Sequence, residues 1–165
     1  MVVRCTKKML DLLDRQQVAL VELDPTDGDW YLNLLWIDRR KCLLLTHSGT
    51  LFSVFHGDIR NGDLRPIDAY LIDAIESELR AEQLPADTFP EFHADGVLLA
   101  RTSSRRTLGF MTDMAAEARY TIADQGGLTG CDIGTINRRL RRSLHNHDGY
   151  VTPIELVEAK LATRS

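Results

Sequence analysis

The stretch Trp30-Tyr31-Leu32-Asn33-Leu34-Leu35-Trp36-Ile37 is apolar at every position except Asn33. A strand with one face in water alternates apolar and polar residues, whereas a strand covered on both faces is apolar throughout. We therefore expect a central strand here, with other elements packed against both of its faces.

Two further strands follow this stretch at short intervals. Asp38-Arg39-Arg40-Lys41 interrupts the apolar pattern, residues 42–46 resume it, and residues 51–55 repeat it after the turn His47-Ser48-Gly49-Thr50. Parallel neighbours need a connection of about a dozen residues or more, and these connections are far shorter. The three strands are therefore expected to form an antiparallel meander.

Helical signals flank the meander on both sides. Residues 2–5 read as a strand, and Thr6 can cap a helix that follows it. Pro66 suits the first turn of a second helix, which should end before Pro85. Its apolar face repeats every four residues, at Ile67, Leu71, Ile75 and Leu79.

The last third of the chain predicts one more strand and three helices. Residues 96–100 read as a fourth core strand, and an apolar helical face then runs from Leu108 to Ile122. The next helix is expected to start after Asp132 and to end at Gly149, and Thr152 should cap the last one. The prediction is a single α+β domain over residues 1–165: an antiparallel meander sheet with a fourth core strand and packed helices.

The composition is that of a globular protein. The 165 residues are 44% hydrophobic and 27% charged, and no apolar run approaches the roughly 20 residues that cross a bilayer. With no secretory apolar segment at the N-terminus, a cytoplasmic location is expected. Cys5, Cys42 and Cys131 are widely spaced, which indicates reduced thiols rather than a zinc or redox site, and no metal or cofactor is predicted.

The net charge of −4 is unevenly distributed along the chain. Residues 1–100 hold 10 Lys and Arg against 17 Asp and Glu, whereas residues 101–165 hold 10 against 7. The whole chain therefore does not read as a nucleic-acid binder, but its C-terminal third can present a local basic surface.

Several motifs are distributed over nearly the whole chain. They are Arg4-Cys5-Thr6-Lys7-Lys8, Trp30-Tyr31-x-Asn33-Leu34-Leu35-x-Ile37-Asp38-Arg39-Arg40-Lys41-Cys42, Thr50-Leu51-Phe52-Ser53, Arg106-Thr107-Leu108-Gly109-x-Met111-x-Asp113 and, more loosely, Tyr150-Val151-Thr152-Pro153-Ile154-Glu155. This set resembles a family of short bacterial proteins that is catalogued as a domain of unknown function. The resemblance implies a single domain, and it implies no activity, cofactor or catalytic residue.

The first candidate site lies between the fourth strand and the helix after it. Hydroxyls and cations gather at this helix N-terminus, where free N–H groups and the helix dipole attract an anion. The residues of this predicted anion site are Ser103, Ser104, Arg105, Arg106 and Thr107. The alternative is that a serine merely caps the helix while the arginines form internal ion pairs.

The second candidate is the cationic turn Arg39-Arg40-Lys41, which could contact phosphates. His47 could act as an acid or base, but a five-residue strand of roughly 17 Å separates it from this turn. The two are therefore not expected to share one small site. The alternative is a solvated turn in which Asp38 pairs with a nearby arginine.

The third candidate is the helix that begins near Ile133. Arg138, Arg141, Arg142 and His145 recur at helical spacing and are expected to share one exposed face, with Asn137 at its N-terminal end. Such a face could bind nucleic acid or an acidic protein, including the acidic part of a second copy of this chain. His145, His147 and Asp148 do not have the spacing of a metal site, and this grouping reads as incidental.

The sequence contains no recognisable catalytic signature, so three functions stay open. The leading hypothesis is a non-enzymatic module that holds an anionic partner, either nucleic acid or an acidic protein surface. It would use the C-terminal arginine face of Arg138, Arg141 and Arg142 and the turn Ser104-Arg105-Arg106. The first alternative is a metal-independent phosphate-ester enzyme such as a nuclease. His47 or His93 would act as acid or base, and Arg106 would stabilise the negative charge of the transition state. The second is a partner-inhibiting protein of a mobile element or phage.

Overall fold

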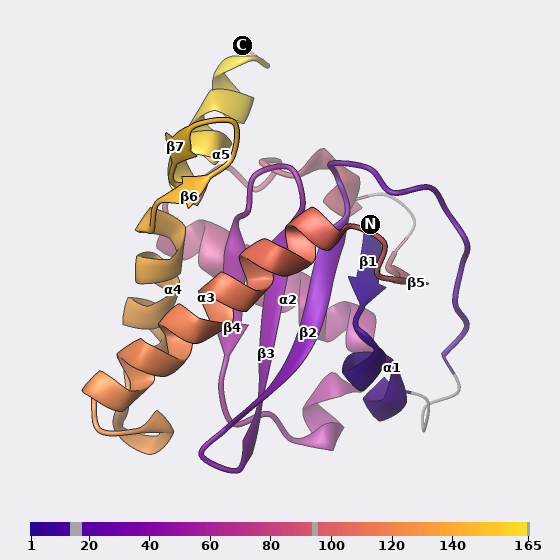
Figure 1. Ribbon diagram of the computed structural model, residues 1–165. Coiled ribbons are helices and arrows are strands. Elements are labelled where there is room, and N and C mark those ends of the chain that lie inside the picture. Colours follow the sequence, from indigo (N-terminus) through magenta and orange to yellow (C-terminus); the bar gives the residue numbers. More distant parts are fainter. Residues whose placement is uncertain (14–17, 94–95, 165) are drawn as a thin grey trace.

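A five-stranded sheet forms the middle layer of the computed structural model, which describes residues 1–13, 18–93 and 96–164 (Figure 1). The strand order is β4-β3-β2-β1-β5. The bounds are β1 (Val2–Cys5), β2 (Trp30–Ile37), β3 (Arg40–His47), β4 (Ser53–His56) and β5 (Leu98–Arg101).

The sheet is mixed, which corrects the prediction of an antiparallel one. β2, β3 and β4 form the expected antiparallel meander, but β1 is parallel to both β2 and β5. Residues 6–29 connect β1 to β2 and include the helix α1 (Lys7–Leu13), so the connection is long enough to return the chain in the same direction. The α+β class is confirmed.

Helices cover both faces of the sheet, as the apolar pattern of β2 predicted (Figure 1). One core includes residues of α1 and of α2 (Ile67–Ala81), and the other includes residues of α3 (Arg105–Asp124) and of α4 (Ile133–Arg142). Consecutive residues of β3 show the division, since Leu45 belongs to the first core and Leu44 to the second. Short 3₁₀ turns complete the connections: η2 (Asn61–Leu64), η3 (Pro90–His93) and η4 (Leu128–Gly130).

The C-terminal segment differs from the predicted helix that ended at Gly149. α4 ends at Arg142, since Ser143 adopts an extended backbone, and Leu144 beyond it is 67% exposed. A small hairpin follows, made of β6 (His145–Asn146) and β7 (Tyr150–Val151). α5 (Pro153–Ala162) begins with the predicted capping box, in which Thr152 and Glu155 bond reciprocally.

None of the helices that the structure describes combines the length and apolar character needed to cross a membrane. The three cysteines are free thiols, with Cys5 and Cys42 buried and Cys131 partly buried. Burial raises the pKa of the Cys5 thiol to about 12, so it stays protonated and unreactive at neutral pH.

Candidate functional site

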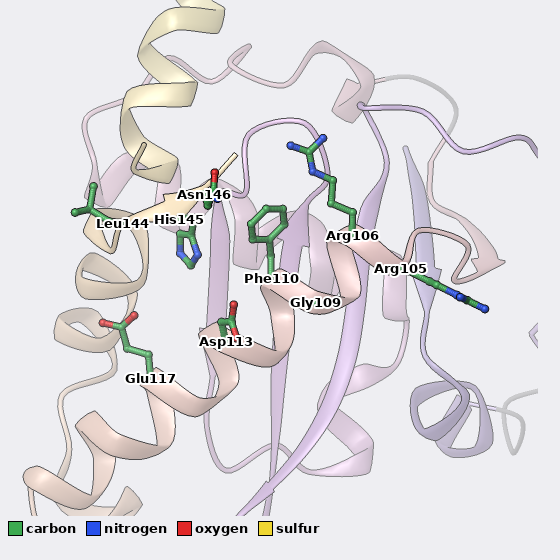
Figure 2. A pocket seen from close by; sticks show the side chains of 9 residues that line it. All are labelled: Arg105, Arg106, Gly109, Phe110, Asp113, Glu117, Leu144, His145 and Asn146. Carbon is green, nitrogen blue, oxygen red and sulfur yellow. The ribbon is translucent and has the colours of Figure 1, made fainter. Parts of the chain in front are cut away.

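A groove of about 580 Å³ runs along one face of α3 (Figure 2). Its other wall comes from Leu144, which lies between α4 and β6, and from β6 itself. The lining residues are Arg105, Arg106, Gly109, Phe110, Asp113 and Glu117 from α3, together with Leu144, His145 and Asn146. The α3 residues recur every three or four positions, which places them on one side of the helix. The groove thus joins two cations of the first predicted site to His145 of the third.

One end of the groove is cationic. Arg105 is exposed and forms no ion pair with any residue the structure describes, and Arg106 meets only the carboxylate of Asp148, at 3.5 Å. The Asp148 side chain is 85% exposed, so this pair is weak. Both guanidinium groups also lie at the N-terminus of α3, where the helix dipole disfavours a cation. Figure 2 shows that Arg106 extends beside Phe110, whereas Arg105 points away from the other lining side chains. An anion bound beside Arg106 would strengthen its weak pairing and offset the unfavourable dipole there.

Phe110 lies in the middle of the groove between aromatic and cationic neighbours. Its ring centroid is 5.8 Å from that of His145, edge to face, and 5.8 Å from that of His147, which stacks on it. The guanidinium carbon of Arg106 lies 5.9 Å from the Phe110 centroid. These contacts hold the β6–β7 hairpin against α3 and orient Arg106 at the mouth of the groove.

His145 is buried within the groove wall, with 7% of its surface exposed. Its Nε2 atom is shielded from solvent and has no hydrogen-bond partner in the described part of the chain. Burial lowers the pKa of this imidazole, although Glu117 and Asp113 act in the opposite direction. His145 is therefore neutral at neutral pH, with one hydrogen-bonding group left unused.

The other end of the groove is acidic. Asp113 is exposed, and Glu117 accepts a hydrogen bond from Arg139 Nε at 3.1 Å. Arg106 and Asp113 are seven positions apart, which corresponds to about 10 Å along a helix axis. The groove therefore presents opposite charges at its two ends, a polarity that depends on how α3 packs and that the sequence did not predict.

The hydroxyl groups of the predicted anion site serve α3 itself. The Ser104 side chain caps the helix by accepting a hydrogen bond from the Thr107 N–H at 3.1 Å. Thr107 is buried, with its hydroxyl bonded to Ser104 and Ser48, and Ser103 lies 3.3 Å from the Tyr31 hydroxyl. These hydroxyls are engaged within the fold, and Ser103, Ser104 and Thr107 are not among the residues that line the groove with the arginines.

The arginines of α4 do not form the exposed face that their spacing predicted. Arg141 is fully buried, and its guanidinium donates to Glu78 Oε2 at 2.7 Å, to Glu82 Oε1 at 2.8 Å and to the Ser53 carbonyl at 3.1 Å. It also lies 5.0 Å from the ring centroid of Phe52. The prediction fails because α2 supplies carboxylates from the opposite layer, at the end of the sheet where the two helices meet.

Asn137 is also buried, contrary to prediction, and it completes the edge of the sheet. Its Oδ1 accepts from the Phe55 N–H at 2.6 Å, and its Nδ2 donates to the Phe55 carbonyl at 3.1 Å. β4 is the outermost strand on this side, so these bonds satisfy backbone groups that no further strand would pair.

The remaining cations of α4 are exposed but paired. Arg142 donates to Glu82 Oε2 at 2.7 Å, and Arg138 lies 3.7 Å from Asp132. His145, predicted on the same face, lies beyond the end of the helix in β6. A usable signal was present, since Glu78 lies in the last turn of α2 and Glu82, four residues later, caps its C-terminus, but this pair reads equally well as a solvated surface.

The histidines of the enzymatic alternative do not meet Arg106. His47 lies at the far end of β3 from Arg40, as expected, and is fully buried with Nε2 bonded to Glu91 Oε1 at 2.9 Å. Its Nδ1 accepts from the Thr50 N–H at 3.1 Å, and burial lowers its pKa. The side chain of His93 lies outside the described part of the structure.

Among the described residues, no cluster of three or more His, Cys, Asp and Glu side chains could hold a metal ion. The family described as "Domain of unknown function (DUF6933)" matches residues 2–156. No curated protein matches the chain.

Proposed function

Because the chain belongs to this family of unknown function, DUF6933, we propose its role from geometry: a binding module that holds an anionic group of a partner in the α3 groove. The observation that carries this proposal is the contrast between two sets of arginines. Those of α4 are each matched by a carboxylate, whereas Arg105 is unpaired among the described residues and Arg106 is only loosely paired.

The charge at the far end of the groove favours an acidic protein segment over nucleic acid. A continuous phosphate backbone that followed the groove would meet Asp113, whose exposed carboxylate would repel it, whereas the charge of Glu117 is offset by its ion pair with Arg139. A protein segment can place a carboxylate against the arginines and a polar or basic group against the acids. The acidic part of a second copy of this chain is one such partner. We further propose that the protein acts in the bacterial cytoplasm.

A binding role also fits the histidine in the groove better than catalysis does. A general base must reach the proton it removes, directly or through one water. The Nε2 atom of His145 is covered by its neighbours, so a substrate would need to displace them first.

The test is a titration of the labelled protein with an oligoglutamate peptide at low salt, followed by NMR. The amides of Gly109, Phe110 and Asn146 are expected to shift, and the double change Arg105→Glu and Arg106→Glu should abolish the shifts. Arg138→Glu is the matched control, because it reverses an exposed cation on α4.

Two outcomes would contradict the proposal. One is peptide binding that survives the double charge reversal at α3. The other is an equal loss in the Arg138 variant, which would show a response to net charge alone. Sedimentation of the wild-type protein and the double variant shows whether the partner is a second copy of the chain.

A further inference from the structure

The end of the β2–β3 hairpin carries an exposed tryptophan. Trp36 is 54% exposed, whereas Trp30, at the other end of the same strand, is fully buried. Lys41 is its partner in the antiparallel register, and Lys41 Nζ lies 5.6 Å from the centroid of the Trp36 ring. An aromatic ring and a cation are thus presented together, in a protein that buries its other tryptophan completely.

The hairpin turn holds an arginine in a backbone conformation that favours glycine. Ile37 pairs with Arg40, so Asp38 and Arg39 form a two-residue turn, with φ of 49° and 62°. Such turns prefer Asn-Gly, because both residues need positive φ. Asp38 has a structural task, since its Oδ2 accepts from the Leu128 N–H at 2.8 Å.

Arg39 has no comparable task. Its side chain is exposed and forms no hydrogen bond or ion pair with the part of the chain that the structure describes. Strain of this kind persists at sites where the side chain serves a ligand.

The carboxylates near the turn are already engaged. Asp38 bonds the Leu128 backbone, and Asp58 pairs with Arg40 at 2.6 Å. Lys41 Nζ donates to the neutral Asn61 side chain at 2.8 Å. Positive charge therefore remains at Arg39 in the turn and at Lys41 in β3, opposite Trp36 of β2.

We propose that the β2–β3 hairpin end binds single-stranded nucleic acid, with a base stacked on Trp36 and the flanking phosphates held by Arg39 and Lys41. Bases stack on aromatic side chains regardless of sequence, and cations track the backbone. A duplex keeps its base faces covered, so the exposed ring favours a single strand over a double one. The hairpin lies at the opposite end of the molecule from β6 and β7, so this surface is separate from the α3 groove (Figure 1).

The test uses the full-length protein and an oligothymidylate at low salt. Its two tryptophans make intrinsic fluorescence informative, because only Trp36 is open to a stacked base. We expect quenching that Trp36→Phe removes. Anisotropy of an end-labelled oligonucleotide should show binding weakened about tenfold or more by Trp36→Ala.

Arg39→Gly separates a ligand role from a structural one. It should weaken oligonucleotide binding and reduce the salt dependence by about one phosphate contact. It should also raise the melting temperature, because glycine relieves the positive φ. A fall in melting temperature with unchanged binding would overturn the proposal.

Two matched variants test whether this surface is separate from the α3 groove. The Arg105→Glu and Arg106→Glu double variant should bind the oligonucleotide like the wild type, and Trp36→Ala should still bind oligoglutamate. Absence of oligonucleotide binding would overturn the proposal. So would duplex binding as tight as single-strand binding, or full competition by oligoglutamate at Trp36, which would assign this surface to an acidic protein.

Discussion

At the residue scale, Arg141 is a fully buried charge at the centre of an ion-pair network. A guanidinium with no exposed surface must be matched by hydrogen bonds and opposite charge, and Glu78, Glu82 and the Ser53 carbonyl provide them. Such an arrangement is costly to break, because removing one partner leaves the others buried and unmatched.

We therefore predict that Arg141→Met lowers the free energy of unfolding by about 3 kcal/mol. The matched control is Arg138→Met on the same helix, whose ion pair with Asp132 is exposed and should contribute less than about 1 kcal/mol. Urea denaturation measures both values. Equal losses in the two variants would show that the buried network contributes nothing specific.

Glu82 links this network to pH. The hydrogen bond from Arg142 lowers its pKa below the ordinary value, with Arg141 contributing and burial opposing. A carboxyl whose pKa is lower in the folded state stabilises the fold above its ordinary pKa, and this stabilisation is lost as the pH falls.

The wild-type free energy of unfolding is therefore expected to fall as the pH drops from about 5 to about 3. Glu82→Gln should start less stable and show a smaller fall over the same interval. Glu22→Gln, which removes an exposed carboxylate, serves as the control. Denaturation curves at several pH values measure the slopes, and parallel slopes for Glu82→Gln and wild type would refute the assignment.

At the scale of elements, α4 closes the edge of the sheet with side chains instead of a strand. Asn137 bonds both backbone groups of Phe55, and Arg141 bonds the Ser53 carbonyl. An uncovered edge strand is a template for pairing with other chains. Two polar residues of this helix, Asn137 and Arg141, are therefore directed into the molecule, while its other cations stay exposed.

Asn137→Leu should destabilise the protein by about 2–3 kcal/mol, because two buried backbone groups lose their partners without a large change in volume. Light scattering should also show faster aggregation on mild heating. Ser143→Ala is the control, since its hydroxyl bonds the Arg139 carbonyl at the exposed end of the same helix. A neutral effect at Asn137 would mean that water satisfies the edge equally well.

At the scale of the whole molecule, one sheet carries two cores. Leu44 and Leu45 are adjacent in β3, both are essentially buried, and they point into opposite layers. Loss of packing on either face should therefore loosen the sheet that both faces share.

Leu44→Ala and Leu45→Ala are each expected to cost about 3 kcal/mol, in the range for buried leucines. Unfolding should stay a single transition, with far-UV circular dichroism and tryptophan fluorescence changing together. Because Trp30 reports on the first core, a Leu44 variant in which its signal changes separately from the circular dichroism would show that the layers unfold independently.

The sequence by itself determined the features that depend on near neighbours. Doubly apolar β2 predicted a strand covered on both faces, short connections predicted the meander, and the capping box at Thr152 marked the start of α5. These signals are local because strand alternation, turn length and helix capping each involve residues only a few positions apart.

Only the tertiary structure decided that β1 is parallel to its neighbours and that the arginines of α4 pair with carboxylates. Arg141 bonds Glu82, which is 59 positions away in the sequence, and β1 pairs with β5, which is nearly a hundred positions away. An arginine on a helix face looks the same in sequence whether it meets water or a carboxylate. Which of the two it meets depends on how the layers stack, and that is a property of the assembled fold.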